Sequence, residues 1–391
     1  MSHQLIVRSP DLQQLQNEGF DLEVRAGFLL IKDVPYVTAT REIKRGILIS
    51  ALELNGEQTK QPANHVAMWT GEHPCHHDGR VISAISNPSA AHDLGNEIRS
   101  DFTFSAKAAY RDYHHKMTTY IGRITGEAQA IDPTVSANTF PLIKAEEQES
   151  VFRYLDTATS RVGIGALNER LSNQKIAIVG LGGTGSYVLD LVAKTCVQEI
   201  HLFDGDVFSQ HNAFRSPGAA SIEELQAKPL KVAYMAEIYG KMRRGILAHE
   251  VFADGETAEL REMGFVFLCL DRGSAKKVII KSLVQWGIPF VDVGMGILRV
   301  QDGLTGLMRV TCFVPGTDTA VLGRIDYSDS EMLENEYSTN IQIVELNALN
   351  AALAVMQWKK LYKIYRDSSR TNSYSYSIAA NEMANDNEEA A

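Results

Sequence analysis

The sequence predicts an α/β protein: a mixed, mostly parallel sheet with helices on both faces, preceded by a smaller α+β domain. Three observations support this prediction. The apolar run 176–179 leads into a glycine-rich turn and a helical pattern, the run 199–203 ends at an acidic residue, and so does the run 265–270. Short apolar runs that alternate with helical patterns are typical of parallel strands buried on both faces.

The first 150 residues differ from the rest and predict the α+β domain. Polar turns separate strand-like segments at residues 28–34, 46–53, 65–69 and 80–85. A helix is predicted after them, because apolar residues recur at spacings of three and four: Tyr113, Met117, Ile121, Ile124 and Ala128.

These patterns divide the chain into three parts. Residues 1–150 form the α+β domain, residues 151–378 form the α/β domain, and residues 379–391 are a polar, acidic tail that we expect to be disordered. A long helix at about 341–365 and a strand at 374–378 complete the second domain. The helix should pack on the sheet through its apolar positions Val344, Leu346, Ala351, Leu353 and Met356.

The glycine-rich turn predicts phosphate binding. Glycines allow the backbone N–H groups to approach phosphates closely, and the N-terminus of the following helix adds partial positive charge. A dinucleotide-binding dehydrogenase begins in the same way, so the turn alone leaves both classes open. The candidate residues are Gly180, Gly182, Gly183, Gly185 and Ser186.

The polar residues after the second strand favour a triphosphate. Asp204 ends that strand, where an acid can accept hydrogen bonds from ribose hydroxyls. Arg215 and Lys231 can neutralise charge on phosphoryl oxygens, and Asp271 can hold Mg²⁺ against them. A dehydrogenase has little use for this set, to which Asp206 and Asn212 also belong.

In sequence, the chain resembles the ThiF/MoeB/ubiquitin-activating superfamily over residues 160–365. The matching motifs are GLGGTGS at 180–186, DGDVFSQHNAFR at 204–215, a lysine that opens the next helix, and an aspartate that ends the strand after it. The resemblance implies a Rossmann-like adenylation domain in which Asp204 binds the ribose and Asp271 positions Mg²⁺ and the α-phosphate. Asn212, Arg215 and Lys231 would bind the phosphates; Lys228 competes with Lys231, which we prefer because it directly precedes the apolar helix start. Arg161 lies where the family supplies an arginine to ATP.

The implied function is ATP-dependent adenylyl transfer to the C-terminal carboxylate of a ubiquitin-like protein, with release of pyrophosphate. We expect it to feed a bacterial ubiquitin-like conjugation pathway and, by the same resemblance, to involve a homodimer. A sulfur-carrier protein of cofactor synthesis is the alternative partner. An NAD-dependent oxidoreductase is the rival class, because it would share the fold and Asp204.

The cysteines bear on the mechanism. The four cysteines include no Cys-x-x-Cys pair, so the family's structural zinc site is not expected. No cysteine follows Pro315 before the last long helix; Cys312 is the nearest thiol, with a structural role as the default. We therefore consider an oxyester on a hydroxyl of this crossover segment, or direct release of the acyl-adenylate. The hydroxyls are Thr317, Thr319, Ser328, Ser330, Ser338 and Thr339.

The first domain contains one distinctive segment at residues 69–83. Its His-Pro…Gly…Val-Ile-Ser run resembles the motif of the ubiquitin-conjugating fold, in which the nucleophilic cysteine would fall near Ser83. The resemblance implies a conjugating-enzyme-like module, whereas a docking or dimerisation domain is the alternative. A metal site is disfavoured because neighbouring residues of an extended loop diverge: His73, Cys75, His76 and His77.

Charge and hydropathy exclude some classes. The formal net charge is −10, which disfavours nucleic acid or an anionic membrane as the main partner. The sequence shows neither an apolar run of about 18 residues nor a signal-peptide pattern, so we expect a cytoplasmic protein.

Overall fold

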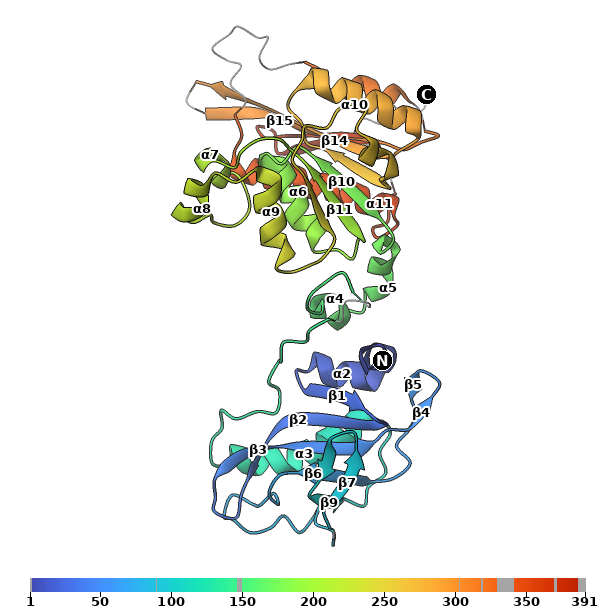
Figure 1. Cartoon of the computed structure of the whole chain (residues 1–391), viewed down its shortest axis with the longest axis vertical. Helices are drawn as coiled ribbons and strands as arrows, with labels where there is room; N and C mark the ends of the chain where they lie inside the picture. Colours follow the sequence, from blue (N-terminus) through green and yellow to red (C-terminus); the bar gives the residue numbers. More distant parts are fainter. Residues whose placement is uncertain are drawn as a thin grey trace. The chain divides into compact units, whose positions relative to one another are not determined.

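The computed structural model describes residues 2–88, 90–145, 150–301, 303–317, 319–328, 341–368 and 371–385. The chain divides into two compact units (Figure 1), and the connection between them is assigned partly to each unit. The first unit comprises Met1–Ile143 and Thr157–Val162, and the second comprises Lys144–Asp156 and Gly163–Ala391.

The first unit is built on a five-stranded antiparallel sheet with the order β1-β2-β3-β6-β9. Its strands are β1 (Asp21–Arg25), β2 (Phe28–Val37), β3 (Ile43–Ala51), β6 (Val66–Thr70) and β9 (Phe102–Ser105). Two short hairpins accompany the sheet: β4 (Leu54–Asn55) with β5 (Gln58–Thr59), and β7 (His92–Gly95) with β8 (Ile98–Ser100). The helices are α1 (Ser2–Arg8), α2 (Pro10–Asn17), α3 (Tyr113–Gln129) and α4 (Thr157–Arg161).

The α+β class predicted for the first unit is confirmed, with one wrong element. The segments 28–34, 46–53 and 65–69 correspond to β2, β3 and β6, and the predicted helix is α3. Residues 80–85 are not a strand; they form turns with isolated bridges at each end. Ile82 and Ile85 are both buried, and the N–H of Ile85 donates to the carbonyl of Ile82. The spacing of three residues between Ile82 and Ile85 therefore reflects a turn and not a strand.

Helix α3 buries a lysine in the core of the first unit. Lys116 is 2% exposed, and its Nζ donates to Ser50 Oγ at 2.9 Å. Burial lowers the pKa of Lys116 to about 8, because the charged ammonium loses its hydration. The lysine is therefore less stabilised as a cation in the folded chain than in the unfolded one.

Replacing Lys116 by methionine should stabilise the first unit at pH 7 by at most about 3 kcal/mol. A group whose folded-state pKa is depressed costs stability while it is charged in both states, below pH 8. The cost disappears as pH rises toward the unfolded pKa, so the variant's advantage should shrink between pH 8 and about 10.5. Hydrogen exchange of α3 amides in urea, read by mass spectrometry, measures this difference. A pH-independent difference would contradict the prediction.

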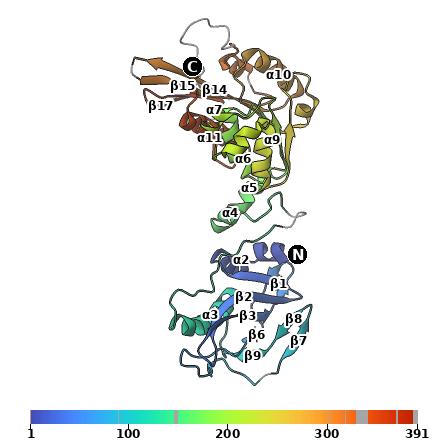
Figure 2. The same cartoon turned by 60° about the vertical axis from the view of Figure 1, so that its left-hand side comes forward.

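The second unit is built on an eight-stranded mixed sheet with the order β12-β11-β10-β13-β14-β15-β16-β17. The parallel strands are β10 (Lys175–Val179), β11 (Glu199–Phe203), β12 (Ile246–His249), β13 (Phe265–Leu268) and β14 (Phe290–Val300). The antiparallel strands are β15 (Gly303–Phe313), β16 (Ser373–Ser377) and β17 (Glu382–Asn385), and Figure 2 shows them at one end of the sheet.

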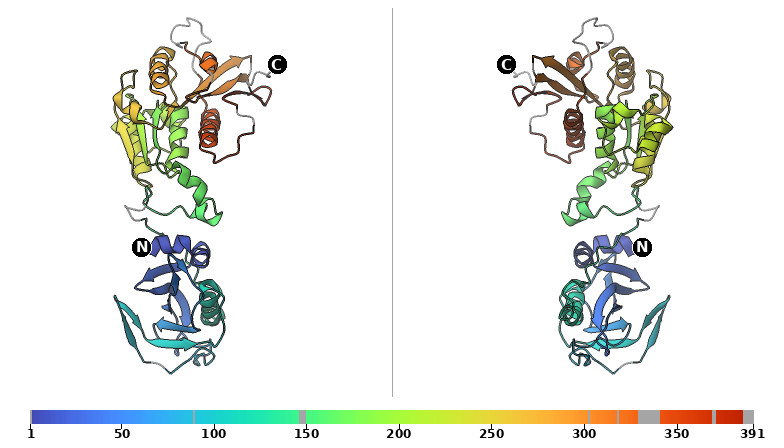
Figure 3. Two further views of the ribbon diagram at one scale, coloured as in Figure 1. Left: turned by 90° about the vertical axis from the view of Figure 1, so that its right-hand side faces the viewer. Right: turned by 90° about the vertical axis from the view of Figure 1, so that its left-hand side faces the viewer.

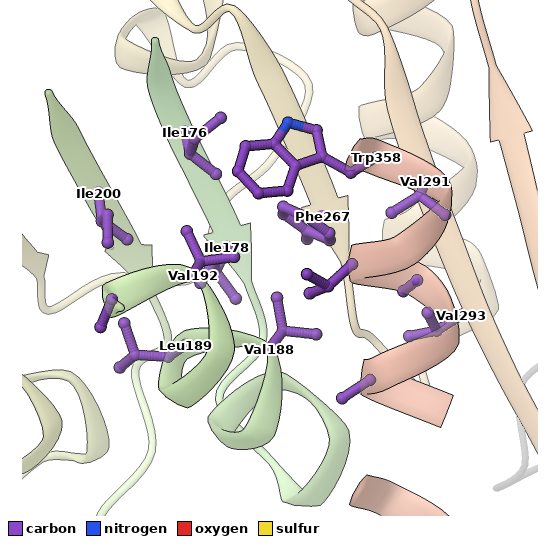
Figure 4. Close-up of a cluster of buried hydrophobic side chains, with 14 of the residues drawn as sticks. Ile176, Ile178, Val188, Leu189, Val192, Ile200, Phe267, Val291, Val293 and Trp358 are labelled. Atoms are coloured by element: carbon purple, nitrogen blue, oxygen red, sulfur yellow. The ribbon is translucent and has the colours of Figure 1, made fainter. Parts of the chain in front are cut away.

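Helices cover both faces of this sheet, as the continuous burial of its central strands requires. On one face, Ile176 and Ile178 of β10 pack in a cluster with side chains of α6, α9 and α11. On the other face, Ala177 and Val179 pack with α10. Figure 4 shows Trp358 of α11 beside Phe267, and Figure 3 shows α6 and α11 side by side. The helices of the unit are α5 (Gly165–Asn168), α6 (Gly183–Ala193), α7 (Gln210–Ala213), α8 (Ile222–Ala227), α9 (Lys231–Gly240), α10 (Gly273–Trp286) and α11 (Val344–Leu361).

The predicted α/β class is thus confirmed, with three corrections of detail. Strand β13 ends at Leu268 rather than at residue 270. On α11, Val344 and Met356 are exposed and do not pack on the sheet; Asn347, Asn350 and Trp358 are buried instead. Residues 382–385, which we expected to be disordered, form the edge strand β17, because β16 offers its free edge for pairing. Within the described part of the chain, none of the helices has the length and apolar character that a membrane span requires.

Candidate functional site

The glycine-rich turn between β10 and α6 brings the helix close to the sheet. A Cβ at Gly185 would lie 1.9 Å from the carbonyl oxygen of Gly180, and a Cβ at Gly183 would lie 2.2 Å from Asn347 Nδ2. Gly180 has a φ of +90°, which a residue with a side chain rarely adopts. Gly182 differs, since a Cβ at this position would have no atom within 4 Å. The turn is therefore packed on one side and open on the other.

The open side of the turn faces a pocket of about 1110 Å³ in the second unit. It lies beyond the carboxyl ends of the parallel strands β10, β11 and β13, where α/β sheets bind ligands. Most of the predicted site residues line it: Gly180, Gly182, Gly183, Asp204, Asp206, Arg215, Lys231 and Asp271.

Lys231 and two aspartates form a network that lines this pocket. Lys231 Nζ lies 2.6 Å from Asp206 Oδ2 and 3.4 Å from Asp204 Oδ1. Asp204 is buried and accepts from the N–H groups of Leu181 at 2.7 Å and Asp206 at 2.9 Å. Lys228 is exposed at the end of α8 and does not line the pocket. The structure therefore places Lys231, and not Lys228, with the aspartates.

Arg215 lines the pocket and has one unpaired donor. Its Nε is buried and has no acceptor among the described residues. Burial lowers the pKa of Arg215, and the negative charge of Asp271 opposes this shift. Buried polar groups in proteins are nearly always hydrogen-bonded, so this unpaired Nε is an exception that makes Arg215 a candidate ligand-binding residue of the pocket.

The remaining predicted residues are not among those that line the pocket. Gly185 and Ser186 are inside α6, where Ser186 Oγ donates to the carbonyl of Gly183 at 2.7 Å. Asn212 is buried and its Oδ1 accepts from the backbone and the hydroxyl of Ser209, which orders the segment before Arg215. Arg161 belongs to α4 of the first unit, where its guanidinium lies 5.4 Å from the ring centroid of Phe140.

A second group of polar residues, of which Lys276 and Asn350 line the same pocket and Asp292 is buried behind it, was not predicted from the sequence. Lys276 on α10 and Asp292 on β14 are both buried, with Lys276 Nζ 2.8 Å from Asp292 Oδ1. Burial raises the pKa of Asp292, and the positive charges of Lys276 and Arg309 oppose this. Asn350 of α11 also lines the pocket. An acid inside the apolar run 290–293 was the one signal that could have indicated this group.

The acidic residues of the pocket suit a magnesium ion that a nucleotide brings with it. Among the described residues, no group of three His, Cys, Asp or Glu side chains could hold a metal by itself. Mg²⁺ bound to a nucleotide needs one or two carboxylates, because phosphates and water fill its other positions. Asp206 and Asp271 both line the pocket and are exposed, so the residues present fit this kind of site.

Two glycine substitutions separate the packed and open sides of the turn. Gly185→Ala should destabilise the second unit by about 3 kcal/mol or more, because its methyl group meets the backbone of Gly180. Gly182→Ala should leave stability within about 1 kcal/mol but weaken ATP binding, because its methyl group points into open pocket space. Thermal unfolding and calorimetric titration with ATP measure the two effects. Equal stabilities of the two variants would contradict this account of the turn.

The α/β fold and the pocket beyond its strand ends define the protein as a nucleotide-binding α/β protein. The comparison with family models agrees with this class. The ThiF family model matches residues 156–390, more than half of the chain, and the chain belongs to the ThiF family. This membership supports ATP-dependent adenylyl transfer to a carboxylate. A second model, a domain of unknown function named DUF6791, matches residues 10–157.

Similar solved structures include those of MccB and PaaA. The crystal structure of E. coli MccB with succinimide is 18% identical, with a TM-score of 0.45 over 58% of this chain and 67% of that one. The crystal structure of PaaA is 15% identical, with a TM-score of 0.46 over 70% and 82%. The structure of E. coli MccB with ATP is 18% identical, with a TM-score of 0.44 over 58% and 67%. No curated protein sequence matches the chain.

Proposed function

We propose that this protein activates the C-terminal carboxylate of a ubiquitin-like protein as an acyl-adenylate, in a bacterial ubiquitin-like conjugation pathway. One observation carries the proposal most directly: Arg215, Lys231 and Asp271, which lie far apart in sequence, line the same pocket as the glycine turn. Family membership adds the adenylyl-transfer chemistry. The ubiquitin-like partner rests on the sequence resemblance and on the extra first unit.

The proposed reaction needs positioning and charge stabilisation more than proton transfer. The substrate carboxylate is ionised at pH 7 and attacks the α-phosphorus of ATP. A carboxyl oxygen–phosphorus bond forms, the bond from the α-phosphorus to the bridging oxygen breaks, and pyrophosphate leaves with the electron pair. Arg215 and Lys231 would neutralise charge on the phosphoryl oxygens. Mg²⁺, held by Asp271 through the nucleotide, would supply further charge neutralisation.

The direct test is pyrophosphate exchange into ATP. The purified chain should catalyse this exchange when supplied with a small ubiquitin-like protein encoded beside it, and the adenylate should be detectable by mass spectrometry of that protein. Exchange with a sulfur-carrier protein instead would favour the alternative role in cofactor synthesis. Calorimetric binding of NAD in preference to ATP would refute the adenylyltransferase and support the oxidoreductase. Sedimentation tests the expected homodimer, and fractionation of cells tests the expected cytoplasmic location.

An ester intermediate, where one forms, is proposed to use a hydroxyl. Cys312 is fully buried and burial raises its pKa to about 12, and the pKa of Cys269 is raised for the same reason. Neither thiol suits a nucleophile. Among the described crossover hydroxyls, Ser328 lines the pocket and its Oγ donates to Asp326 Oδ1 at 2.6 Å. Ser330, Ser338 and Thr339 lie outside the described residues. An acyl-enzyme that thiol reductant cleaves at neutral pH would refute the oxyester.

The first unit is proposed to be a conjugating-enzyme-like module. In support, an antiparallel meander precedes the His-Pro segment, and Ser83 is exposed on the turn that follows it. Cys75 is buried and burial raises the pKa of its thiol, which argues for a structural role. His76 and His77 both contact Glu127 through Nδ1, at 2.7 and 2.9 Å. If Cys75→Ala and Ser83→Ala both formed conjugates as the unmodified chain does, the first unit would have a binding role only.

A further inference from the structure

Two buried asparagines of α11 contact two different segments that line the pocket. Asn347 and Asn350 lie three residues apart, so they belong to one side of the helix, and their side chains are 0% and 1% exposed. Asn347 contacts the glycine turn, and Asn350 contacts β14. Asparagine is usually an exposed residue, so the burial of two asparagines at this spacing indicates a specific role.

Asn347 fixes the end of the glycine turn. Thr184 Oγ1 donates to Asn347 Oδ1 at 2.9 Å, and Thr184 is the second residue of α6 and lines the pocket. The amide of Asn347 also covers Gly183, because a Cβ built at that glycine would lie between 2.2 and 2.7 Å from Nδ2, Cγ and Oδ1 of the asparagine. The lack of a side chain at Gly183 therefore lets Asn347 reach the first turn of α6.

The first turn of α6 has no side-chain cap of its own. Its N-cap residue is Gly182, and the N–H groups of a first helical turn find no partner within the helix. Asp204 holds the start of the glycine turn, because it accepts from the N–H of Leu181 at 2.7 Å. Asn347 holds the other end of the turn through Thr184, from a position 163 residues further along the chain. The segment between these two contacts is the one that we assign to the phosphates.

Asn350 fixes the position of α11 against the sheet. Its Nδ2 donates to the carbonyl of Gly294 on β14 at 3.1 Å. Since Asn347 lies about one helical turn earlier, this hydrogen bond also sets where Asn347 meets the glycine turn. Helix α11 packs on the same face of the sheet as α6, with the two helices side by side (Figure 3).

These two polar side chains lower the stability of the fold. Each amide leaves one half unpaired: Nδ2 of Asn347 and Oδ1 of Asn350 are buried with no partner in the part of the chain that the structure describes. A buried polar group without a partner is destabilising, and a leucine of similar shape would avoid this cost. Departures of this kind from a stable core are expected at functional sites.

We propose that Asn347 is a positioning residue for the nucleotide. Through Thr184 it holds the first turn of α6 in the conformation that binds the triphosphate, while Asn350 fixes the helix that carries it. This inference rests on the proposed function. Asn347 does not itself line the pocket, so it acts through the turn and not on the nucleotide. Without Asn347 the nucleotide has to order the turn when it binds, which weakens binding.

The test compares Asn347→Leu with Gln357→Leu in the whole chain. Gln357 is the matched control: it is a buried amide of the same helix, its Nε2 donates to the carbonyl of Thr371 at 2.9 Å, its Oε1 is unpaired, and it does not line the pocket. Asn347→Leu should weaken calorimetric binding of AMPCPP, an ATP analogue, by about threefold to tenfold, the contribution of one hydrogen bond. Its thermal stability should match or exceed that of the unmodified chain. Gln357→Leu should leave the affinity for AMPCPP unchanged.

A double-mutant cycle with Thr184→Val shows whether Asn347 acts through Thr184. In the Thr184→Val background, Asn347→Leu should weaken AMPCPP binding by less than about twofold, because the hydrogen bond between the two residues is already lost. A full additional loss in the double variant would overturn the inference. A loss of affinity that Gln357→Leu shares, or one that comes with lower thermal stability, would also overturn it, because the role of Asn347 would then be structural only.

Failure of the proposed function is seen separately from failure of this inference. If the unmodified chain does not bind AMPCPP, the proposed function fails and the inference fails with it. If the unmodified chain binds AMPCPP and Asn347→Leu binds it equally well, only the inference fails.

Discussion

Replacement of Asp271 by alanine is expected to abolish ATP–pyrophosphate exchange. Asp271 lies at the pocket just beyond β13 and carries the carboxylate that we assign to magnesium. Without it the metal and the α-phosphate lose their positioning contact, and positioning is the main source of catalysis when the nucleophile is already ionised. The side chain is exposed, so its removal should leave the fold intact. Exchange assays over a magnesium titration measure the effect.

The control for Asp271→Ala is Glu237→Ala, which removes an exposed acid from α9 outside the pocket. Its exchange rate and magnesium dependence should equal those of the unmodified chain. If Asp271→Ala kept a rate near that of Glu237→Ala, the assignment of Asp271 to the metal would be wrong.

Arg215→Ala and Lys231→Ala should each reduce exchange on the order of a hundredfold, by comparison with other lost charge-stabilising donors. Arg215 has an unused Nε at the pocket, so its loss removes a donor from the phosphates and little from the protein. Lys231 differs, because it also neutralises Asp204 and Asp206. Its loss should therefore lower thermal stability as well as the exchange rate.

Lys228→Ala is the matched control for Lys231→Ala. It removes a lysine three residues away that is exposed and outside the pocket. Its exchange rate should stay within twofold of the unmodified chain, on the order of experimental scatter for surface substitutions. A larger loss in Lys228→Ala than in Lys231→Ala would show that the wrong lysine has been assigned.

The sequence was sufficient to predict the residues of the candidate site that follow the ends of strands. Asp204 ends β11, Asp271 lies shortly after β13, and the glycine turn follows β10. Since parallel strands place their carboxyl ends at one edge of a sheet, residues found there in sequence meet in the structure. The second unit's long helix and central strands were predicted for a similar reason, because strong apolar patterns define them locally.

The remaining pocket residues are placed by contacts between segments that are distant in sequence, and no local sequence pattern shows such contacts. Arg309 enters the pocket because β15 pairs with β14 in a register that sets it opposite Gly294. Asn350 is buried on α11 because it donates to a backbone carbonyl of β14, although an asparagine is usually an exposed residue. Register and buried polar contacts join distant segments, so periodicity cannot show them.

The burial of Lys116 also determines how fast this lysine reacts with acylating reagents. An acylating reagent attacks the neutral amine, and Lys116 is nearly out of solvent while α3 is packed on the sheet. The rate at which this amine is acylated should therefore be set by how often the helix detaches. Lys116 is thus a built-in reporter of opening of the first unit, and a peptide map after timed acetylation would read it.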